Sequence, residues 1–367
     1  MKHAQRIVHL IPLICLGPCA VAGASDFIVG ADTTMIAKSE EAGCVFTVKG
    51  EKRDVFPILK EHGFNCIRLR VFHTPDGKGP ICCDLKYVAG IARRAKAAGL
   101  KLLVDFHYSD TWADPGAQKK PAAWAQLNFD ELKRAVHDYT KDSVATLARE
   151  GVTPDMIQCG NEVNMGMLWD DGKTTSDAQW GRFAELVKSA VDGARAALKP
   201  EDQVRFMHHV ADPRHIVWHF DHLTKHGFEP DIIGVSYYPF WHGTLSELTR
   251  HLAIVSEKYR KDIVIAETAY AWTNRSFDKH GDIHHGRPAE GMPAYTPEGQ
   301  AEFYRQLIAI LKAVPGQRAI GFFCWEPTWL PNDQFGSPMD NLTLFDEKGE
   351  ALPALEAIRD GSRKEQP

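Results

Sequence analysis

Short apolar segments alternate with longer amphipathic segments along almost the whole chain. Eight of the short segments are nearly continuous runs of apolar residues, which is typical of strands buried on both faces of a parallel sheet. We expect these strands at residues 27–30, 66–72, 101–107, 156–161, 204–209, 232–237, 263–267 and 320–325. The pattern therefore predicts a parallel sheet that is covered by helices.

A segment with helical periodicity follows each predicted strand. The expected helices are 51–61, 84–98, 129–150, 177–198, 212–226, 245–259, 297–314 and 352–360. Several end before a glycine, as helix C-termini often do. Eight β-α units in one chain favour a closed barrel over an open doubly wound sheet, and no Gly-x-Gly-x-x-Gly sequence follows the first strand. We therefore predict the α/β class, with a single (β/α)8 TIM barrel.

The first two dozen residues differ from the rest of the chain. Lys2 and Arg6 precede a mainly apolar stretch, which ends in the small residues 22–24. This order is typical of a secretory signal peptide. A membrane anchor is the alternative, but the stretch contains two prolines and is shorter than the roughly 20 residues that a spanning helix needs. We predict a signal peptide at 1–24 and one catalytic barrel at 25–367, secreted or periplasmic and without a membrane span after cleavage.

Charge and cysteine content narrow the class of protein. The formal net charge is −5 and no basic block could track phosphates, so we exclude a nucleic-acid partner. A disulfide from Cys44 to Cys82 or Cys83 stays open. No CxxC pair or HExxH spacing occurs, so we expect neither a metal nor another cofactor. We also expect a monomer. A metal in the histidine-rich segment 278–285 remains an alternative.

Four of the connections that follow predicted strands are long. They span residues 108–128, 163–176, 268–296 and 326–350, after the third, fourth, seventh and eighth strands. In a TIM barrel these connections all lie at the carboxyl end of the strands, where such enzymes build their active sites. We expect the four loops to wall a cleft.

Two glutamates lie at the ends of predicted strands that open onto this cleft. Glu162 follows the fourth strand, and Glu267 closes the seventh. Hydrolysis of a glycosidic bond with retention requires two carboxyl groups about 5–5.5 Å apart, one to donate a proton and one to attack the anomeric carbon. We expect Glu162 to be the acid/base and Glu267 the nucleophile. Arg68, on the second strand, would keep the nucleophile ionised, and Arg70 has the same parity and is not excluded from that role.

Aromatic and polar residues near the same strand ends are suited to binding sugars. Trp and Tyr rings offer flat faces on which sugars stack, and carboxylates and amides bind hydroxyls. The candidates, besides Arg68, are His107, Asp110, Trp112, Asp114, Asn161, Tyr237, Tyr238, Trp241 and Trp325. Trp124 is expected to plug its own loop, and one of His208 and His209 is expected to face the barrel mouth.

These motifs resemble those of glycoside hydrolase family 53, the endo-β-1,4-galactanases that cut arabinogalactan side chains of pectin. The most specific stretch is 105–115 with Gln118 and Pro121, and the triplets Gly160-Asn161-Glu162 and Ala266-Glu267-Thr268 match the acid/base and nucleophile segments of the family. The chain departs from the family at 209–213, where an Asn-Gly turn is usual, and at Phe72, where Trp is common. The resemblance implies a retaining endo-hydrolase whose substrate is β-1,4-galactan.

Two alternatives accompany this interpretation. The same clan includes retaining β-mannanases and cellulases, which differ in the sugar that they accept. A barrel that binds carbohydrate without cleaving it is the second alternative, although the presence of both glutamates disfavours it.

Overall fold

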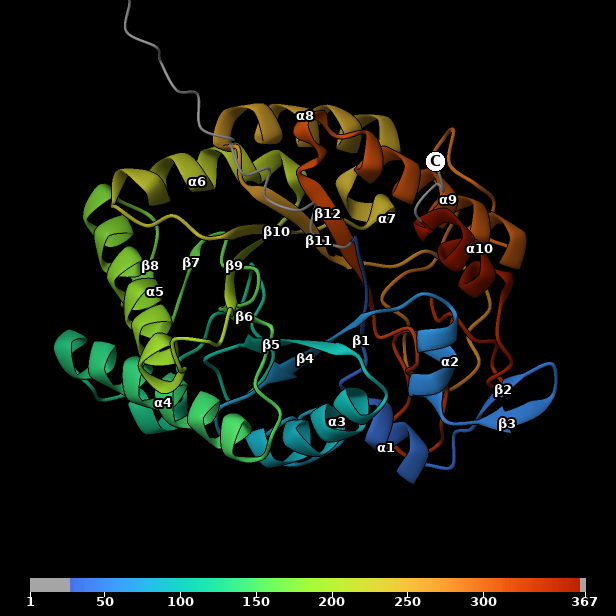
Figure 1. Cartoon of the computed structure of the whole chain (residues 1–367), viewed down its shortest axis with the longest axis horizontal. Helices are drawn as coiled ribbons and strands as arrows, with labels where there is room; N and C mark the ends of the chain where they lie inside the picture. The colour runs from blue at the N-terminus through green and yellow to red at the C-terminus, as the bar shows by residue number, and fades with distance from the viewer. Residues whose placement is uncertain (1–26, 364–367) are drawn as a thin grey trace, which may run out of the picture.

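Eight parallel strands form a closed barrel in the computed structural model, which describes residues 27–363 (Figure 1). The order around the barrel is β1-β12-β11-β10-β9-β6-β5-β4. The strands are β1 (Ile28–Asp32), β4 (Cys66–Val71), β5 (Lys101–Phe106), β6 (Met156–Cys159), β9 (Arg205–Ala211), β10 (Ile232–Ser236), β11 (Asp262–Thr268) and β12 (Ala319–Trp325). The predicted fold class and single TIM barrel are confirmed.

An outer ring of helices covers the barrel (Figure 1). These helices are α2 (Val55–Glu61), α3 (Leu85–Ala97), α4 (Phe129–Arg149), α5 (Asp177–Ala197), α6 (Ile216–Lys225), α8 (Leu245–Tyr259), α9 (Pro297–Ala313) and α10 (Pro353–Ser362). Two short helices, α1 (Ile36–Glu41) and α7 (Pro239–His242), and three 3-10 turns, η1 (Ala122–Trp124), η2 (Pro213–His215) and η3 (Pro315–Gln317), lie in the connections. Small antiparallel hairpins pair β2 (Phe46–Val48) with β3 (Glu51–Arg53), and β7 (Gly166–Met167) with β8 (Gly172–Lys173).

Two predicted helices begin later than their periodicity indicates. The helix expected from residue 51 begins at Val55, because the Asp54 side chain accepts a hydrogen bond from the backbone N–H of Phe56 and caps the helix there. The helix expected from residue 212 is preceded by η2, in which Pro213 breaks the regular helical hydrogen bonding. Short loop helices and two-residue strands carry too little periodicity to be found in a sequence.

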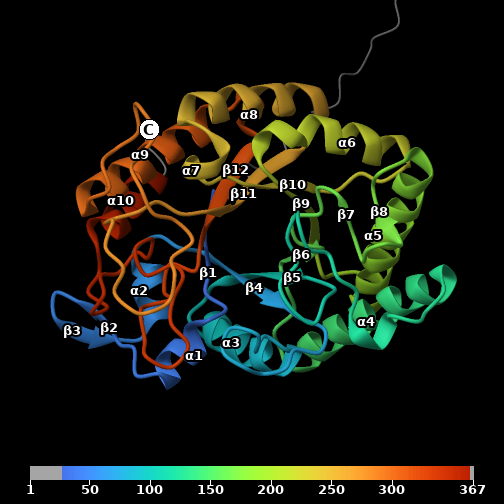
Figure 2. The same cartoon turned by 180° about the vertical axis from the view of Figure 1, so that it is seen from behind.

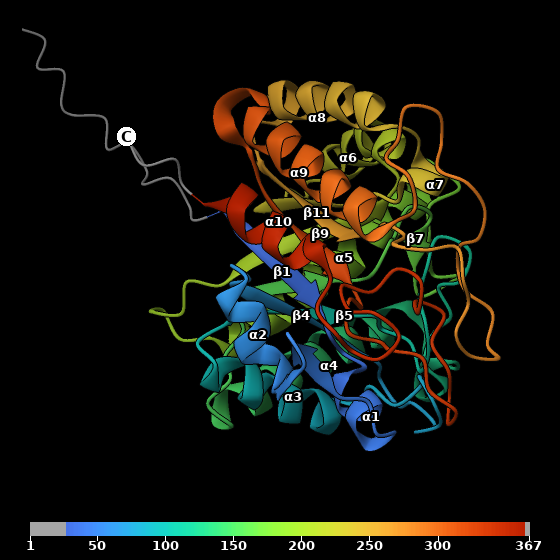
Figure 3. The same ribbon diagram turned by 90° about the vertical axis from the view of Figure 1, so that its right-hand side faces the viewer.

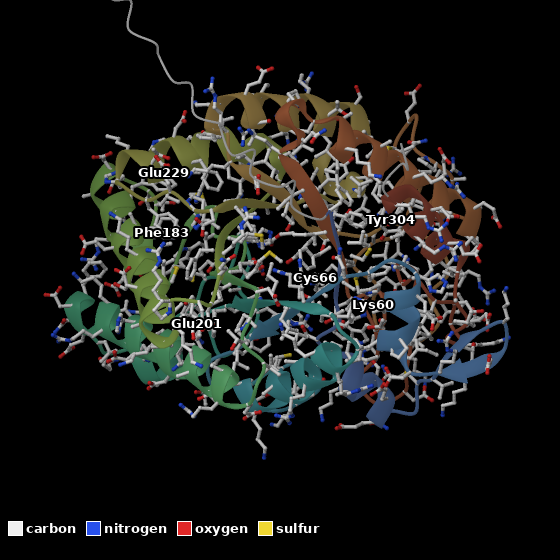
Figure 4. All side chains as sticks on the ribbon, in the orientation of Figure 1. Lys60, Cys66, Phe183, Glu201, Glu229 and Tyr304 are labelled. Atoms are coloured by element: carbon white, nitrogen blue, oxygen red, sulfur yellow. The ribbon has the colours of Figure 1, made fainter. Side chains whose placement is uncertain are left out.

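The amino-terminal half of the barrel is filled with apolar side chains. One cluster contains Ile28, Cys66, Leu103, Met156, Met207, Ile232, Val264, Ala266, Ile320 and Phe323. Figure 4 labels Cys66 within the ring of strands. Gly30 makes room for this filling, since a Cβ there would lie 2.1 Å from the Phe323 ring. The barrel is therefore packed rather than open, and chemistry is restricted to its other end.

The long loops lie at the carboxyl end of the strands, as predicted. Figure 2 shows the orange and red loops after β11 and β12 in front of the barrel, and Figure 3 shows them projecting from its right-hand side. None of the helices within residues 27–363 has the length and hydrophobicity that crossing a bilayer requires. The predicted signal peptide lies outside the described residues. Cys44, Cys82, Cys83 and the other three cysteines of the described part are free thiols, so the bridge left open above does not form.

Candidate active site

A layer of polar side chains lies above the apolar filling of the barrel. Side chains alternate between the two faces of a strand, so residues two positions apart point the same way. On β4 this places Cys66 in the apolar cluster, with Arg68 and then Arg70 successively closer to the carboxyl end. Asp32, Arg68 and Asp105 are all at most 1% exposed and are joined by ion pairs of 2.9 Å. The carboxyl end of the barrel interior is therefore a charged, desolvated network.

Glu162 enters this layer from a sharply turned segment after β6. The strand ends at Cys159, two residues earlier than predicted, and the backbone then takes positive φ at Gly160 (97°) and Glu162 (45°). Positive φ is unfavourable for a residue with a Cβ, so the surrounding structure must hold Glu162 in place. Its carboxyl group accepts a hydrogen bond from the Ser236 hydroxyl at 2.5 Å.

Glu267 lies on β11 itself and points into the barrel. Alternation would place it outside, because its neighbour Ala266 belongs to the interior cluster. The register of β11 shifts against both neighbouring strands here, and such a bulge turns a side chain to the other face. Glu267 is 6% exposed, and its two oxygens contact the Arg68 Nη1 at 2.9 Å and the Tyr238 hydroxyl at 2.9 Å.

The two glutamates face each other across the barrel mouth. One carboxylate oxygen of Glu162 and one of Glu267 lie within 4.8 Å of each other, and a ring nitrogen of His209 lies within the same distance of both. This separation is of the size that retaining glycosidases use, and it is shorter than the roughly 6.5–9.5 Å between the carboxyl groups of an inverting enzyme.

The surroundings of the two carboxyl groups are electrostatically unequal. Burial, and then the charge of Glu267, raise the pKa of Glu162 to about 8. Burial also raises the pKa of Glu267 above its ordinary value, but the Arg68 guanidinium and the Tyr238 hydroxyl act in the opposite direction. At neutral pH the site therefore favours a proton on Glu162 and a negative charge on Glu267. This division suits a proton donor and a nucleophile.

Comparison with known proteins identifies the family. The model of glycosyl hydrolase family 53 matches residues 28–358, which is nearly the whole barrel. The chain belongs to glycosyl hydrolase family 53. It is 34% identical to the arabinogalactan endo-beta-1,4-galactanase of Cellvibrio japonicus over 97% of this chain and 96% of the relative. Endo-beta-1,4-galactanase of Bacillus subtilis is 32% identical over 91% and 86% of the two chains.

Solved structures agree with this family membership. The Ignisphaera aggregans GH53 catalytic domain has a TM-score of 0.86 at 38% identity, covering 91% of this chain and 96% of that one. A fungal β-1,4-galactanase has a TM-score of 0.79 at 32% identity, covering 90% and 98%. This chain is thus a glycoside hydrolase.

The layer of polar side chains is organised around Arg68 and Asn161. Arg68 forms ion pairs with Asp32, Asp105 and Glu267, and its Nη2 also donates to the Asn161 side-chain oxygen at 2.8 Å. The Asn161 amide nitrogen donates to the Ala113 carbonyl at 2.9 Å. One guanidinium therefore fixes both Glu267 and the residue that precedes Glu162.

The candidate residues in and next to the loop after β5 mostly bind backbone groups and other side chains of the barrel. His107 is 3% exposed; its Nε2 lies 3.1 Å from an Asp105 oxygen, and its Nδ1 accepts from the backbone N–H of Ala113. Asp110 accepts from the backbone N–H groups of Thr74 and Ala122. Asp114 is exposed and accepts from the N–H of Gly116. Trp124 is buried, as predicted.

The aromatic candidates separate into three groups. Trp112 and Trp325 are partly buried and pack edge to face, with ring centroids 6.1 Å apart, and both line an apolar cavity of about 400 Å³. Trp241 is 51% exposed and packs against Tyr238. Tyr237 is a correction: it is 0% exposed and its hydroxyl donates to the Gly243 carbonyl, so it cannot reach a sugar. The strand ends at Ser236, and Tyr238 is the tyrosine whose hydroxyl donates to Glu267.

Three functional neighbours were not predicted as site residues. Ser236 donates to Glu162, and His209, not His208, faces the mouth, with Nε2 2.9 Å from the Ser236 hydroxyl. Ser236 could have been predicted from the sequence, because it lies four residues after Ile232 on one strand and so points to the same interior face. Glu326 is fully buried and pairs with Arg70. Its position after the last strand was the signal.

A second carboxylate cluster lies in the loops after β11 and β12. The Asp282 and Asp340 side chains are 0% exposed, and each has an oxygen without a hydrogen-bond partner within the described part of the chain. Burial, and then the charge of Asp282, raise the pKa of Asp340 to about 7. Asp278 lies close enough for its charge to act on both groups, so the three carboxylates form one acidic cluster.

Proposed function

We propose that this family 53 hydrolase cleaves β-1,4-galactosidic bonds in galactan and type I arabinogalactan by double displacement. Glu162 is the acid/base and Glu267 the nucleophile. The observation that carries the proposal is the pair of carboxylates within 4.8 Å, one beside Arg68 and one with a pKa near 8. The substrate follows from the galactanase names of the relatives in Cellvibrio japonicus and Bacillus subtilis. We further propose that the enzyme acts as a secreted or periplasmic monomer.

In the first step, the proton of the Glu162 carboxyl group passes to the glycosidic oxygen as the C1–O bond breaks. A Glu267 oxygen attacks C1 from the opposite face and forms a glycosyl ester. Ester formation removes the negative charge of Glu267. Because that charge helps to raise the pKa of Glu162, the pKa falls, and Glu162 becomes the base that the second step needs. Water then attacks C1, gives its proton to Glu162 and releases Glu267.

Arg68 and Tyr238 act on the nucleophile in both steps. Their hydrogen bonds use one oxygen of Glu267 each, which fixes the plane of the carboxylate and keeps it ionised before attack. Trp112, Trp241 and Trp325 supply faces for stacking. They come from the loop after β5, from α7 and from the end of β12, and such separate origins suit the curved chain that an axial O4 gives to galactan.

Substrate and stereochemistry are tested together. Purified enzyme should release oligosaccharides from β-1,4-galactan much faster than from β-mannan or cellulose. Proton NMR of a fresh galactan digest should show the β-anomer first, because two displacements restore the configuration. Preference for mannan or cellulose would show that the enzyme is a β-mannanase- or cellulase-like hydrolase, the alternative given above. An initial α-anomer would contradict the double displacement itself.

Replacement of Trp112 by Ala should lower kcat/KM on galactan by roughly five- to thirtyfold, since a stacked aromatic face contributes on the order of 1–2 kcal/mol. The melting temperature controls for unfolding. Normal cleavage of galactan by the variant would remove Trp112 from the binding surface.

A further inference from the structure

Arg70 is a buried cation that the catalytic pair does not use. It lies two residues after Arg68 on β4 and is 1% exposed. Arg68 contacts the nucleophile, whereas the ion pairs of Arg70 go to Asp32 and Glu326 through a single nitrogen, Nη1. Burial of a charge is costly, so a second buried arginine in one small region requires a structural reason.

Glu326 holds Arg70 in place from the end of β12, which is separated from β4 by β1 alone around the barrel. Its carboxylate pairs with Arg70 and also accepts from the backbone N–H of Met35, at 3.1 and 3.3 Å. Glu326 directly follows Trp325, the last residue of β12, and is itself fully buried. The ion pair therefore joins β4, the β1–α1 connection and the end of β12 around one guanidinium.

The Arg70 guanidinium also lies close to two aromatic rings. Nε and Nη2 have no hydrogen-bond partner within residues 27–363. The Arg70 Cζ lies 4.3 Å from the centroid of the Trp112 ring and 6.0 Å from that of Trp325. A guanidinium stacks well on an indole face, and the attraction is stronger where water is excluded. Trp112 is thus held by a cation, in addition to edge contacts with Phe72 and His107.

The two tryptophans held by Arg70 form part of the wall of the apolar cavity described above. The wall also includes Pro80, Ile283 and Phe335, which come from three other loops. Trp112 and Trp325 are the members of this wall that a buried charge fixes to the barrel. Their rings are set at 64° to each other, so they present two faces at an angle rather than one flat surface.

We propose that Arg70 is a positioning residue that fixes Trp112 and Trp325 as a rigid aromatic wall for the sugar chain. This proposal rests on the proposed function. Arg70 contacts no reacting atom; it acts through the tryptophans and governs the affinity for the chain. Its loss should therefore raise KM more than it lowers kcat.

The test is a double-mutant cycle with Arg70→Lys and Trp112→Ala. Lysine keeps the positive charge between Asp32 and Glu326 but lacks the planar group that stacks on indole. Alone, Arg70→Lys should raise KM for galactan roughly five- to tenfold, with kcat falling less than about twofold. In the Trp112→Ala background the same change should raise KM less than about twofold, because the contact that it weakens is already absent. Arg93→Lys, at an exposed arginine, is the matched control.

Two results would overturn the proposal. One is an equal fold increase in KM from Arg70→Lys in the wild type and in Trp112→Ala, which would mean that Arg70 does not act through Trp112. The other is a fall in kcat at unchanged KM, which would place Arg70 with the catalytic pair. If Arg70→Lys does not fold, Glu326→Gln replaces it in the cycle with the same expectations. If the wild type prefers mannan or cellulose, the proposed function fails separately, and the cycle is measured on the polysaccharide that is cleaved.

Discussion

Replacement of Glu267 by Ala is expected to lower kcat on galactan by about 10⁵-fold, which corresponds to about 7 kcal/mol of transition-state stabilisation. No other carboxylate within residues 27–363 lies beside both Arg68 and Tyr238, so the variant has no group that can form the glycosyl ester. The rate is measured by reducing-end release, with circular dichroism to show that the barrel has folded. Glu201→Gln, at the exposed glutamate labelled in Figure 4, is the matched control.

Azide distinguishes loss of the nucleophile from general damage to the site. In Glu267→Ala the missing carboxylate leaves space for the anion on the face from which the nucleophile attacks. With a dinitrophenyl β-galactooligosaccharide, azide should restore turnover and give an α-glycosyl azide. A β-glycosyl azide, or wild-type rates without azide, would assign the nucleophile to another residue.

Replacement of Glu162 by Ala is expected to lower kcat/KM on galactan by about 10²–10⁴-fold, the range for loss of general acid-base catalysis. With a dinitrophenyl leaving group, which needs no proton, formation of the glycosyl ester should persist and a burst of dinitrophenol should appear. Azide should then attack the ester from the other face and give a β-glycosyl azide. Equal losses on galactan and on the activated substrate would contradict the assignment of Glu162 as the acid.

The pH profile provides a second check on Glu162. The wild type needs a proton on Glu162, whose pKa is about 8, so kcat/KM should fall as the pH rises above that value. The acid limb should reflect protonation of Glu267, whose pKa burial raises above its ordinary value. In Glu162→Ala, measured on the activated substrate, the alkaline limb should be absent. Persistence of that limb would assign it to another group.

The barrel and the catalytic pair could be predicted because their signals are local. Each strand is a short apolar run, each helix has its own period, and parallel strands must end at one rim. These rules placed Glu162 and Glu267 at the same rim, although they are 105 positions apart in the sequence. The alternation of side chains along a strand placed Arg68 and Arg70 on one face of β4. It could not predict which arginine contacts Glu267 and which pairs with Glu326, because those contacts depend on residues from other strands.

Other parts of the site depend on register, which a single sequence does not specify. The bulge in β11 turns Glu267 inward, and regular alternation would have placed it among the helices. The end of β10 at Ser236 decides that Tyr238, not Tyr237, contacts the nucleophile. Asp110 illustrates a different limit: a loop carboxylate can bind a sugar or its own backbone, and the choice depends on how the loop folds.

The pairing of β1 with both β4 and β12 has a consequence for how the protein reaches its native state. The first strand pairs along five residues with a strand that lies almost 300 positions later in the chain. Until residues 319–325 are present, β1 and β11 each have an edge whose backbone groups lack a partner. The aromatic wall that Arg70 positions cannot form in a growing chain either, because the ion pair of Arg70 needs Glu326. We therefore expect folding to be completed only after synthesis, and slowly, because contacts between distant parts of a chain form slowly.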